Sequence, residues 1–210
     1  MKDIFKFISE LGKLKSDGRR GWKLHGIENP ETTAAHTFQM AMIVWAVGRS
    51  RDDLDLSRAI KMALMHDICE IYSPDLTSHD AVSIDEEKEF TRKDLKNLEP
   101  KKGRPTTEQR KKLKKVKKEL EDEAIDKLTA DLPSDFKEEI SDLWEEYKKR
   151  ITKEAKFVKQ VDNITNLIQG MEYWKEGCDE IEYKLWIRRA KETIDDPDLK
   201  DLLIEVEDSL

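Results

Sequence analysis

The chain has 210 residues and a net charge of −7, with 37% hydrophobic and 40% charged residues but only 8 Gly and 6 Pro. This composition is typical of a protein built mostly from helices with charged outer faces, and it argues against disorder over the whole length. No apolar run approaches the roughly 18 residues of a membrane-spanning helix, and charges interrupt the apolar positions of the N-terminal segment, so we expect no membrane contact, no signal peptide and a cytoplasmic location.

Three helices are predicted in the first third of the chain. The first covers 3–15, where apolar residues recur at helical spacing. The second covers 30–48, because the Asn-Pro-Glu sequence at 29–31 combines a capping side chain, a proline at the first helical position and a carboxylate near the positive end of the helix dipole. The third covers 55–72, and Pro74 helps to end it.

The rest of the chain contains one segment of low order and then further helices. Residues 78–105 carry many charges and two proline-containing breaks, which predicts a long irregular excursion. Helical patterns follow at 107–128, after "DLPSDF" in a segment with Trp144 and Tyr147, at 153–174, and in a last pair separated at Asp195-Asp196-Pro197. We find no convincing strand and no internal repeat, so we predict a single all-α domain over residues 1–210 with a basic insertion at about 80–118.

A basic run lies within this insertion. Residues 101–118 hold ten Lys or Arg against one Glu, a surplus of nine positive charges, so the rest of the chain carries about −16. Such a run could attract phosphate or nucleic acid, but Leu113, Val116 and Leu120 recur in it at helical spacing, and it contains no aromatic residue for base stacking. We therefore favour a solvated helix face over a nucleic-acid-binding segment.

Polar residues lie on the apolar faces of three predicted helices. His36 is in line with the apolar residues at 40, 43 and 47, and Asp162 is in line with those at 158, 161 and 168. His66 and Asp67 stand together at the end of a third apolar run. Because a buried imidazole or carboxylate is costly when it is unpaired, these four side chains need partners, and one shared divalent cation would satisfy all of them.

The chemistry of these side chains narrows the choice of cation. Nitrogen and oxygen ligands without thiolate suit Mn, Fe, Co or Zn, and four protein ligands leave open positions for water and substrate. Cys69 and Cys178 form no CxxC pair, so we expect reduced thiols. On a continuous helix Glu70 would lie on the same side as His66 and Asp67, where it could transfer a proton. The simpler alternatives are a core histidine bonded to a backbone carbonyl and a chance His-Asp pair.

The order His36, then His66-Asp67, then Asp162 resembles the H…HD…D signature of the HD-domain superfamily of metal-dependent phosphohydrolases. Three longer blocks are similar to those of the HD-domain 5′-deoxynucleotidases: "GWKLHGIENPETTAAH", "ALMHDICEIYSPDLT" and "EAKFVKQVDNITNLIQ". The similarity spans about residues 11–173, interrupted by the insertion. It implies an HD-domain helical bundle that hydrolyses deoxynucleoside 5′-monophosphates to deoxynucleosides and phosphate.

The resemblance also implies roles for the residues that match the family motif. His36, His66, Asp67 and Asp162 would bind a divalent transition metal (Mn, Co, Fe or Zn), and Glu70 would be the catalytic carboxylate. The partner of this site would be a deoxynucleoside monophosphate.

The substrate-binding residues implied by the resemblance lie before and after His36 in the chain. Trp22 and Asp75 match residues that contact the deoxyribose and help to exclude ribonucleotides, although Trp22 could equally be a core aromatic. Arg19 or Arg20 would bind phosphate: bacterial members have arginine directly before the tryptophan, where this chain has glycine, but Arg19 matches the R-x-G-W pattern of eukaryotic relatives. Pro74 replaces a family glycine and could shift Asp75, which is also expected to act in catalysis.

The sequence also leads to an expectation about quaternary structure and to two alternative functions. Family members commonly form dimers, which predicts a homodimer with Trp174, Tyr183 and Trp186 as its aromatic surface. One alternative function is HD-type hydrolysis of a triphosphate, cyclic or alarmone nucleotide, for which the insertion would supply basic residues. The other is a non-catalytic nucleic-acid-binding protein with a structural metal, which we favour less.

Overall fold

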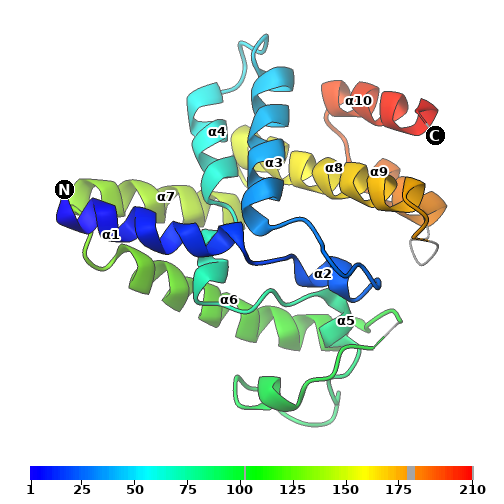
Figure 1. The fold of residues 1–210 in the computed structure, drawn as a ribbon, viewed down its shortest axis with the longest axis horizontal. Helices are drawn as coiled ribbons and strands as arrows, with labels where there is room; N and C mark the ends of the chain where they lie inside the picture. Colours follow the sequence, from blue (N-terminus) through cyan, green and yellow to red (C-terminus); the bar gives the residue numbers. More distant parts are fainter. Residues whose placement is uncertain (102, 179–182, 210) are drawn as a thin grey trace.

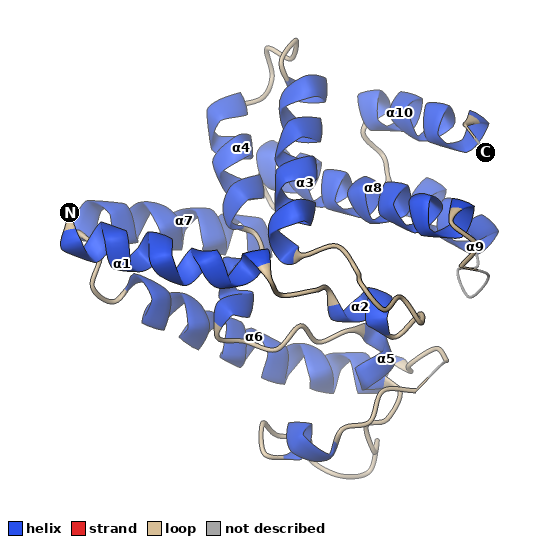
Figure 2. Cartoon of the chain, in the orientation of Figure 1, coloured by secondary structure: helices blue, strands red, loops and turns tan. Residues whose placement is uncertain are grey.

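The computed structural model describes residues 1–101, 103–178 and 183–209, which are arranged almost entirely in helices (Figure 1, Figure 2). Apart from an isolated bridge between Gly18 and Thr32, these residues contain no β-pairing. The α-helices are α1 Lys2–Leu11, α2 Arg20–Lys23, α3 Thr33–Gly48, α4 Leu56–Met65, α5 Ser78–Ala81, α6 Thr107–Thr129, α7 Ser134–Lys149, α8 Lys153–Lys175, α9 Tyr183–Thr193 and α10 Pro197–Asp208. Short 3-10 helices are η1 Gly12–Lys15, η2 Ile68–Ile71 and η3 Asp94–Asn97. The predicted all-α class is confirmed.

Helix α8 is the centre of the packing. Figure 1 shows α3 and α4 side by side, with both crossing α8, while α7 and α9 also pack against it. Ala155, Val161 and Leu167 of α8 are all buried, and a spacing of six residues places them about 120° apart around the helix. Because α8 is covered on several sides, a polar residue at its middle, such as Asp162, is held inside the protein.

The predicted start of the second helix at residue 30 is wrong by three residues. The helix α3 begins at Thr33, and the hydroxyl of Thr32 caps it by accepting a hydrogen bond from the amide of Ala35 at 3.1 Å. Residues before it are paired with the chain at 17–19, because the amide of Arg19 donates to the carbonyl of Glu31 at 3.0 Å. This tertiary pairing overrides the capping signal and places Arg19 beside the first turn of α3.

The predicted continuous helix over 55–72 is also wrong, because α4 ends at Met65 and a 3-10 turn follows at η2. The break has a local cause: the Nδ1 atom of His66 lies 2.8 Å from the carbonyl oxygen of Ala63, which the amide of Asp67 would use in a continuous α-helix. Asp67 takes φ −118° and ψ 14° instead of helical values. The polar pair therefore lies at a corner between two helical segments.

The helix predicted over 3–15 is α-helical only to Leu11 and continues as η1, and the remaining predicted helices differ from the structure only by small shifts in their ends. The excursion after α5 is mostly irregular, as expected. Residues before, within and after α5 pack on α6 through a second apolar cluster formed by Leu76, Ala81, Ile84 and Leu113. Lys102, which belongs to the predicted basic run, lies outside the described residues. Across the described ranges, no helix has the length and apolar character needed to span a membrane.

Candidate functional site

Three elements bring the predicted metal ligands to one place. His36 comes from the first turn of α3, His66 and Asp67 come from the corner after α4, and Asp162 comes from the middle of α8. Both imidazoles are buried, with ring centroids 5.5 Å apart. One donor atom from each of His36, His66 and Asp67 lies within 4.8 Å of the other two. These three groups are close enough to share a single ion.

The hydrogen bonding of His66 suits a metal ligand. Its Nδ1 atom is held by the carbonyl of Ala63, so Nε2 is the nitrogen directed toward Asp67, 2.9 Å from its carboxylate. Among the described residues, this buried Nε2 atom has no hydrogen-bond partner of suitable geometry. Metal-binding histidines commonly use one nitrogen for a backbone carbonyl and the other for the ion. The donor set therefore fits a divalent cation.

Asp162 lies beside this group and is held in its ionised form. Its carboxylate is 3.1 Å from Nε2 of His36, accepts a hydrogen bond from Asn166 at 3.0 Å and pairs with Lys159 at 2.5 Å. Burial acts to raise the pKa of Asp162, but Lys159 and His36 outweigh it and keep the pKa well below its ordinary value. Asp162 could complete a set of two imidazoles and two carboxylates.

Glu31 lies on the other side of the imidazole of His36. Its carboxylate lies 3.5 Å from Nδ1 of His36 and accepts a hydrogen bond from the indole of Trp22 at 2.9 Å. Sequence reasoning assigned Glu31 to the helix dipole and missed this contact. Helical periodicity could not predict this contact, because Glu31 lies before α3 in an extended segment and not on the helix that carries His36.

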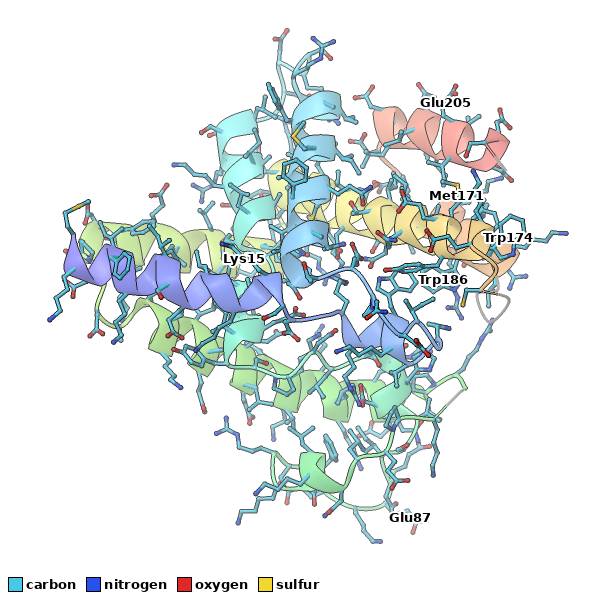
Figure 3. All side chains as sticks on the ribbon, viewed as in Figure 1. Lys15, Glu87, Met171, Trp174, Trp186 and Glu205 are labelled. Carbon is cyan, nitrogen blue, oxygen red and sulfur yellow. The ribbon has the colours of Figure 1, made fainter. Side chains whose placement is uncertain are left out.

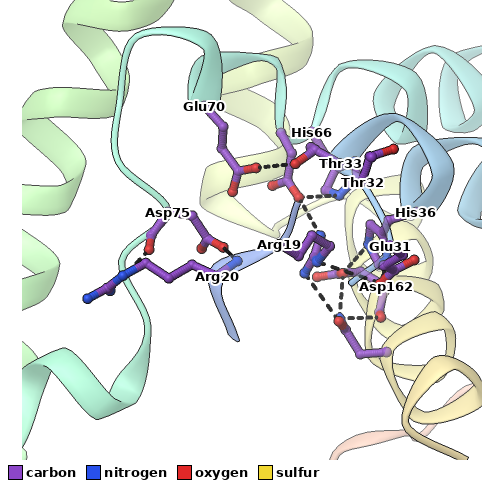
Figure 4. A network of polar contacts seen from close by, with 12 residues as sticks. Arg19, Arg20, Glu31, Thr32, Thr33, His36, His66, Glu70, Asp75 and Asp162 are labelled. Atoms are coloured by element: carbon purple, nitrogen blue, oxygen red, sulfur yellow. Dashed lines mark hydrogen bonds and ion pairs between the residues drawn. The ribbon is translucent and has the colours of Figure 1, made fainter. Parts of the chain in front are cut away.

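Arg19 is the arginine that reaches the cluster. Its guanidinium donates to the carboxylate of Asp67 at 3.1 Å and to Oδ1 of Asn166 at 3.2 Å, and Figure 4 shows it between the two groups of carboxylates. Burial opposes the charge on Arg19, but Asp67 and Asp162 raise the pKa of Arg19 above its ordinary value. Arg20, the other candidate from sequence, pairs with Asp80 and does not join the cluster.

Glu70 and Asp75 line a cavity of about 480 Å³ next to Arg19. The carboxylate of Glu70 accepts a hydrogen bond from the hydroxyl of Thr33 at 3.0 Å, and that of Asp75 accepts one from the amide of Arg20 at 3.0 Å. Burial and the neighbouring charges of Asp67 and Asp75 raise the pKa of Glu70 well above its ordinary value. Glu70 thus faces the site even though the helix that was expected to carry it is broken.

Trp22 belongs both to the core and to a larger pocket of about 1120 Å³. Its ring stacks on Trp186 with centroids 5.2 Å apart. Tyr183 is buried and stacks on Trp174. The expectation of an exposed aromatic surface at Trp174, Tyr183 and Trp186 is therefore corrected: Trp186 packs on Trp22 and Tyr183 packs inside.

Lys117 was missed by sequence reasoning, which assigned the whole basic run to a solvated face. Its ammonium group donates to the carbonyl of Leu76 at 3.0 Å and lies 3.6 Å from the carboxylate of Glu121. Burial opposes its charge, but Glu121 and then Asp75 raise the pKa of Lys117. A usable signal was present, because Lys117 lies one helical turn after Leu113, on the side of α6 that is buried.

Comparisons with known proteins identify the family of this chain. A family model described as HD domain matches residues 11–201. The chain is 31% identical over 182 residues to a protein of Dictyostelium discoideum named 5'-deoxynucleotidase HDDC2, covering 84% of this chain and 80% of that one, and it is 30% identical to the mouse protein of the same name over 81% of this chain and 69% of that one.

Solved structures share the fold. A conserved hypothetical protein from Pyrococcus furiosus superposes with a TM-score of 0.65 at 25% identity, over 97% of this chain and 98% of that one. A predicted metal-dependent phosphohydrolase from Magnetospirillum magnetotacticum gives a TM-score of 0.62 at 21% identity, over 99% of this chain and 91% of that one.

Proposed function

The chain belongs to the HD-domain family, and from this membership we propose that it hydrolyses deoxynucleoside 5′-monophosphates with a divalent metal ion bound by His36, His66, Asp67 and Asp162. The names of the similar 5′-deoxynucleotidases support the substrate class. The observation that carries the proposal is the buried Nε2 atom of His66, which lacks a hydrogen-bond partner among the described residues and is directed into a group of metal-binding donors.

The donor set limits which metals would serve. Imidazole nitrogens and carboxylate oxygens suit Mn, Co, Fe or Zn, and softer ions that require thiolate are disfavoured. A bound divalent ion would supply a Lewis acid that offsets charge on the phosphoryl group and makes water a better nucleophile.

Arg19 and Glu70 would act on the phosphate and on the proton. Arg19 lies beside Asp67, so its guanidinium is placed to pair with phosphoryl oxygens that arrive at the cluster. Glu70 lines the same cavity as Arg19, and its raised pKa favours a carboxylic acid that can donate a proton to the leaving 5′ oxygen. Arg20 is held by Asp80 and is assigned to positioning Asp75.

Trp22 and Asp75 would contact the sugar and distinguish deoxyribose from ribose. Both line the larger pocket together with Arg19, which is the arrangement that a nucleotide with its phosphate at Arg19 requires. A pocket fitted around deoxyribose leaves the 2′-hydroxyl of a ribonucleotide without a partner, so its desolvation is not compensated. Asp75, which follows Pro74, accepts a hydrogen bond from the amide of Arg20, and this contact supports its place beside the pocket.

A cytoplasmic homodimer is also part of the proposal, carried over from the resemblance. Phe38, Met42 and Trp45 form an exposed apolar row on α3, which supports a contact between copies on this face. Light scattering coupled to gel filtration measures the mass in solution and tests the dimer independently of activity.

The enzymatic proposal is tested by measuring phosphate release from matched deoxy and ribo monophosphates, each with Mn, Co, Fe or Zn. We expect a higher kcat/KM for the deoxy compounds and loss of activity and bound metal in Asp162→Ala. Equal rates for the two sugars would reject the roles of Trp22 and Asp75 but keep the phosphohydrolase. Activity confined to triphosphates or cyclic nucleotides would reject the substrate class.

A further inference from the structure

The larger pocket extends well beyond the ligand cluster. One end is formed by Arg19 and Asn166, which contact Asp67 and Asp162 respectively. The pocket measures about 1120 Å³, more than twice the cavity beside Glu70. Pockets for drug-sized ligands are roughly 300–1,000 Å³, so this one has room for more than a mononucleotide.

Four arginines line the rest of this pocket: Arg104 from the segment before α6, Arg110 from the first turn of α6, and Arg188 and Arg189 from α9. All four are exposed, and none of them forms an ion pair with another described residue. Other arginines of the chain differ, since Arg51, for example, is bound to two carboxylates. Among the described residues, these four arginines thus form a concentration of positive charge without ion-pair partners, which we call the arginine rim.

Aromatic rings form the wall of the pocket that contains Trp22. Trp186 stacks on Trp22, and the ring of His25 meets those of Trp186 and His79 at centroid distances of 5.8 and 5.4 Å. Figure 3 shows Trp186 between α9 and α2. Flat rings of this kind pack against sugars and bases. A nucleoside would fit against this wall, with the arginine rim beyond the proposed sugar position.

We propose that the arginine rim binds a second phosphate group, so that deoxynucleoside 5′-monophosphates carrying a phosphate or phosphodiester on the 3′ oxygen are substrates of the same site. This rests on the proposed function, which places the 5′ phosphate near Arg19 and the sugar beside Trp22 and Asp75. A neutral base gives four guanidinium groups no counter-charge, and Glu192, the carboxylate of α9 in the pocket wall, offsets only one of them.

Phosphate is the anion that suits this rim, because guanidinium groups bind phosphate oxygens through paired hydrogen bonds. The chemistry at the 5′ end is unchanged: water adds to the phosphorus, the bond from phosphorus to the 5′ oxygen breaks, and that oxygen takes a proton. The 3′ phosphate stays on the product.

The test compares thymidine 5′-monophosphate, thymidine 3′,5′-bisphosphate and the 5′-phosphorylated dinucleotide of thymidine. We expect kcat/KM for the two longer compounds to exceed that for the monophosphate by about tenfold at low salt, the effect of one charge-assisted phosphate contact. In the double variant Arg188→Gln/Arg189→Gln this ratio should fall toward one. Lys184→Gln is the matched control, since Lys184 is an exposed cation of α9 outside the pocket and should keep the wild-type ratio.

The outcomes separate this inference from the function on which it rests. Equal kcat/KM for all three compounds would overturn the second-phosphate site while the 5′-nucleotidase stands. If no monophosphate is hydrolysed, the function fails, and calorimetric binding of the bisphosphate to wild type and the double variant then decides the inference. A preference for both longer compounds assigns the rim to oligonucleotide ends, and one for the bisphosphate alone assigns it to free nucleotides. If the enzyme instead prefers thymidine triphosphate and the double variant loses this preference, the placement of the rim at the 3′ phosphate is overturned.

Discussion

The imidazole of His66 has two effects that depend on the same hydrogen bond. Nδ1 lies 2.8 Å from the carbonyl oxygen of Ala63. This contact ends α4 at Met65, directly before His66, and it directs Nε2 toward Asp67. Fixing one nitrogen selects the tautomer that leaves the other with a free lone pair. The helix break and the proposed metal-binding geometry therefore depend on one hydrogen bond, which explains why the corner occurs at this polar pair.

The role proposed for Glu70 is tested by Glu70→Gln, which keeps the shape of the side chain and its contact with Thr33 but cannot transfer a proton. We expect metal content to stay at the wild-type level while kcat falls by roughly a hundred- to ten-thousand-fold, the range for general acid or base catalysis. Phosphate release and elemental analysis are measured on the same sample. Near wild-type turnover would reduce Glu70 to a structural residue.

Lys117 provides a test of how far the basic insertion takes part in the site. Replacing its ammonium group in Lys117→Met removes the cation near Glu70, Asp75 and Glu121, so we expect kcat/KM to fall by about tenfold, equivalent to one lost charged contact. Lys114→Met is the matched control, because Lys114 is exposed on the same helix. Equal activity of the two variants would show that Lys117 has no role in the site, in agreement with the solvated helix face that the sequence pattern suggested.

Among the elements, periodicity predicted the long helices well, while one tertiary and one local hydrogen bond determined the two helix ends that it misplaced. Helices α6 and α8 follow their apolar patterns closely. The start of α3 and the end of α4 were misplaced because each depends on contacts that spacing does not encode: Arg19 pairing with Glu31 in one case, and His66 bonding to Ala63 in the other. Both errors fall beside the candidate site, where polar side chains compete with the regular backbone pattern.

The short helix α5 offers a pH-dependent prediction. Asp80 closes its capping box with Thr77 and pairs with Arg20. Burial opposes ionisation, but Arg20 and the amide of Thr77 outweigh it and hold the pKa of Asp80 below its ordinary value. A lowered folded-state pKa means that Asp80 stabilises the fold above its unfolded pKa of about 3.9, and that this contribution is lost as pH falls through the folded value.

We therefore expect Asp80→Asn to lower the free energy of unfolding at pH 7 by about 1–2 kcal/mol, the range for a buried charge-assisted hydrogen bond. The difference from wild type should shrink below pH 4, where the wild-type carboxyl begins to take up its proton. Urea denaturation at a series of pH values measures it. A difference that stays constant down to pH 2 would show that the carboxylate charge contributes nothing.

At the scale of the whole molecule, the candidate site joins segments that are distant in the chain. The positions of His36, His66 and Asp162 were predictable because each is a polar residue on an apolar helix face, and such residues must be satisfied together. Arg19 and Asn166 were not predicted to meet, because nothing in their spacing relates a loop after α1 to the middle of α8. The residues that line the pockets depend in the same way on how the helices pack.

A metal ion bound at this junction should stabilise the entire fold, because it would hold α3, the corner after α4 and α8 together and has no equivalent site in the unfolded chain. At a free metal concentration one hundred times Kd the gain is about 2.7 kcal/mol, and for a chain of this length each kcal/mol corresponds to roughly 2–4 °C in Tm.

We expect Mn or Co to raise the Tm of chelator-treated protein by about 5–10 °C. The increment should largely disappear in Asp162→Asn, which removes one carboxylate ligand, and it should persist in Asp126→Asn, which changes an exposed carboxylate of α6. Asp162→Asn will also lower Tm without metal, since Lys159 and His36 lose their ionised partner, so the quantity to compare is the metal-induced increment and not the absolute Tm. The same increment in both variants would place the stabilising ion elsewhere in the protein.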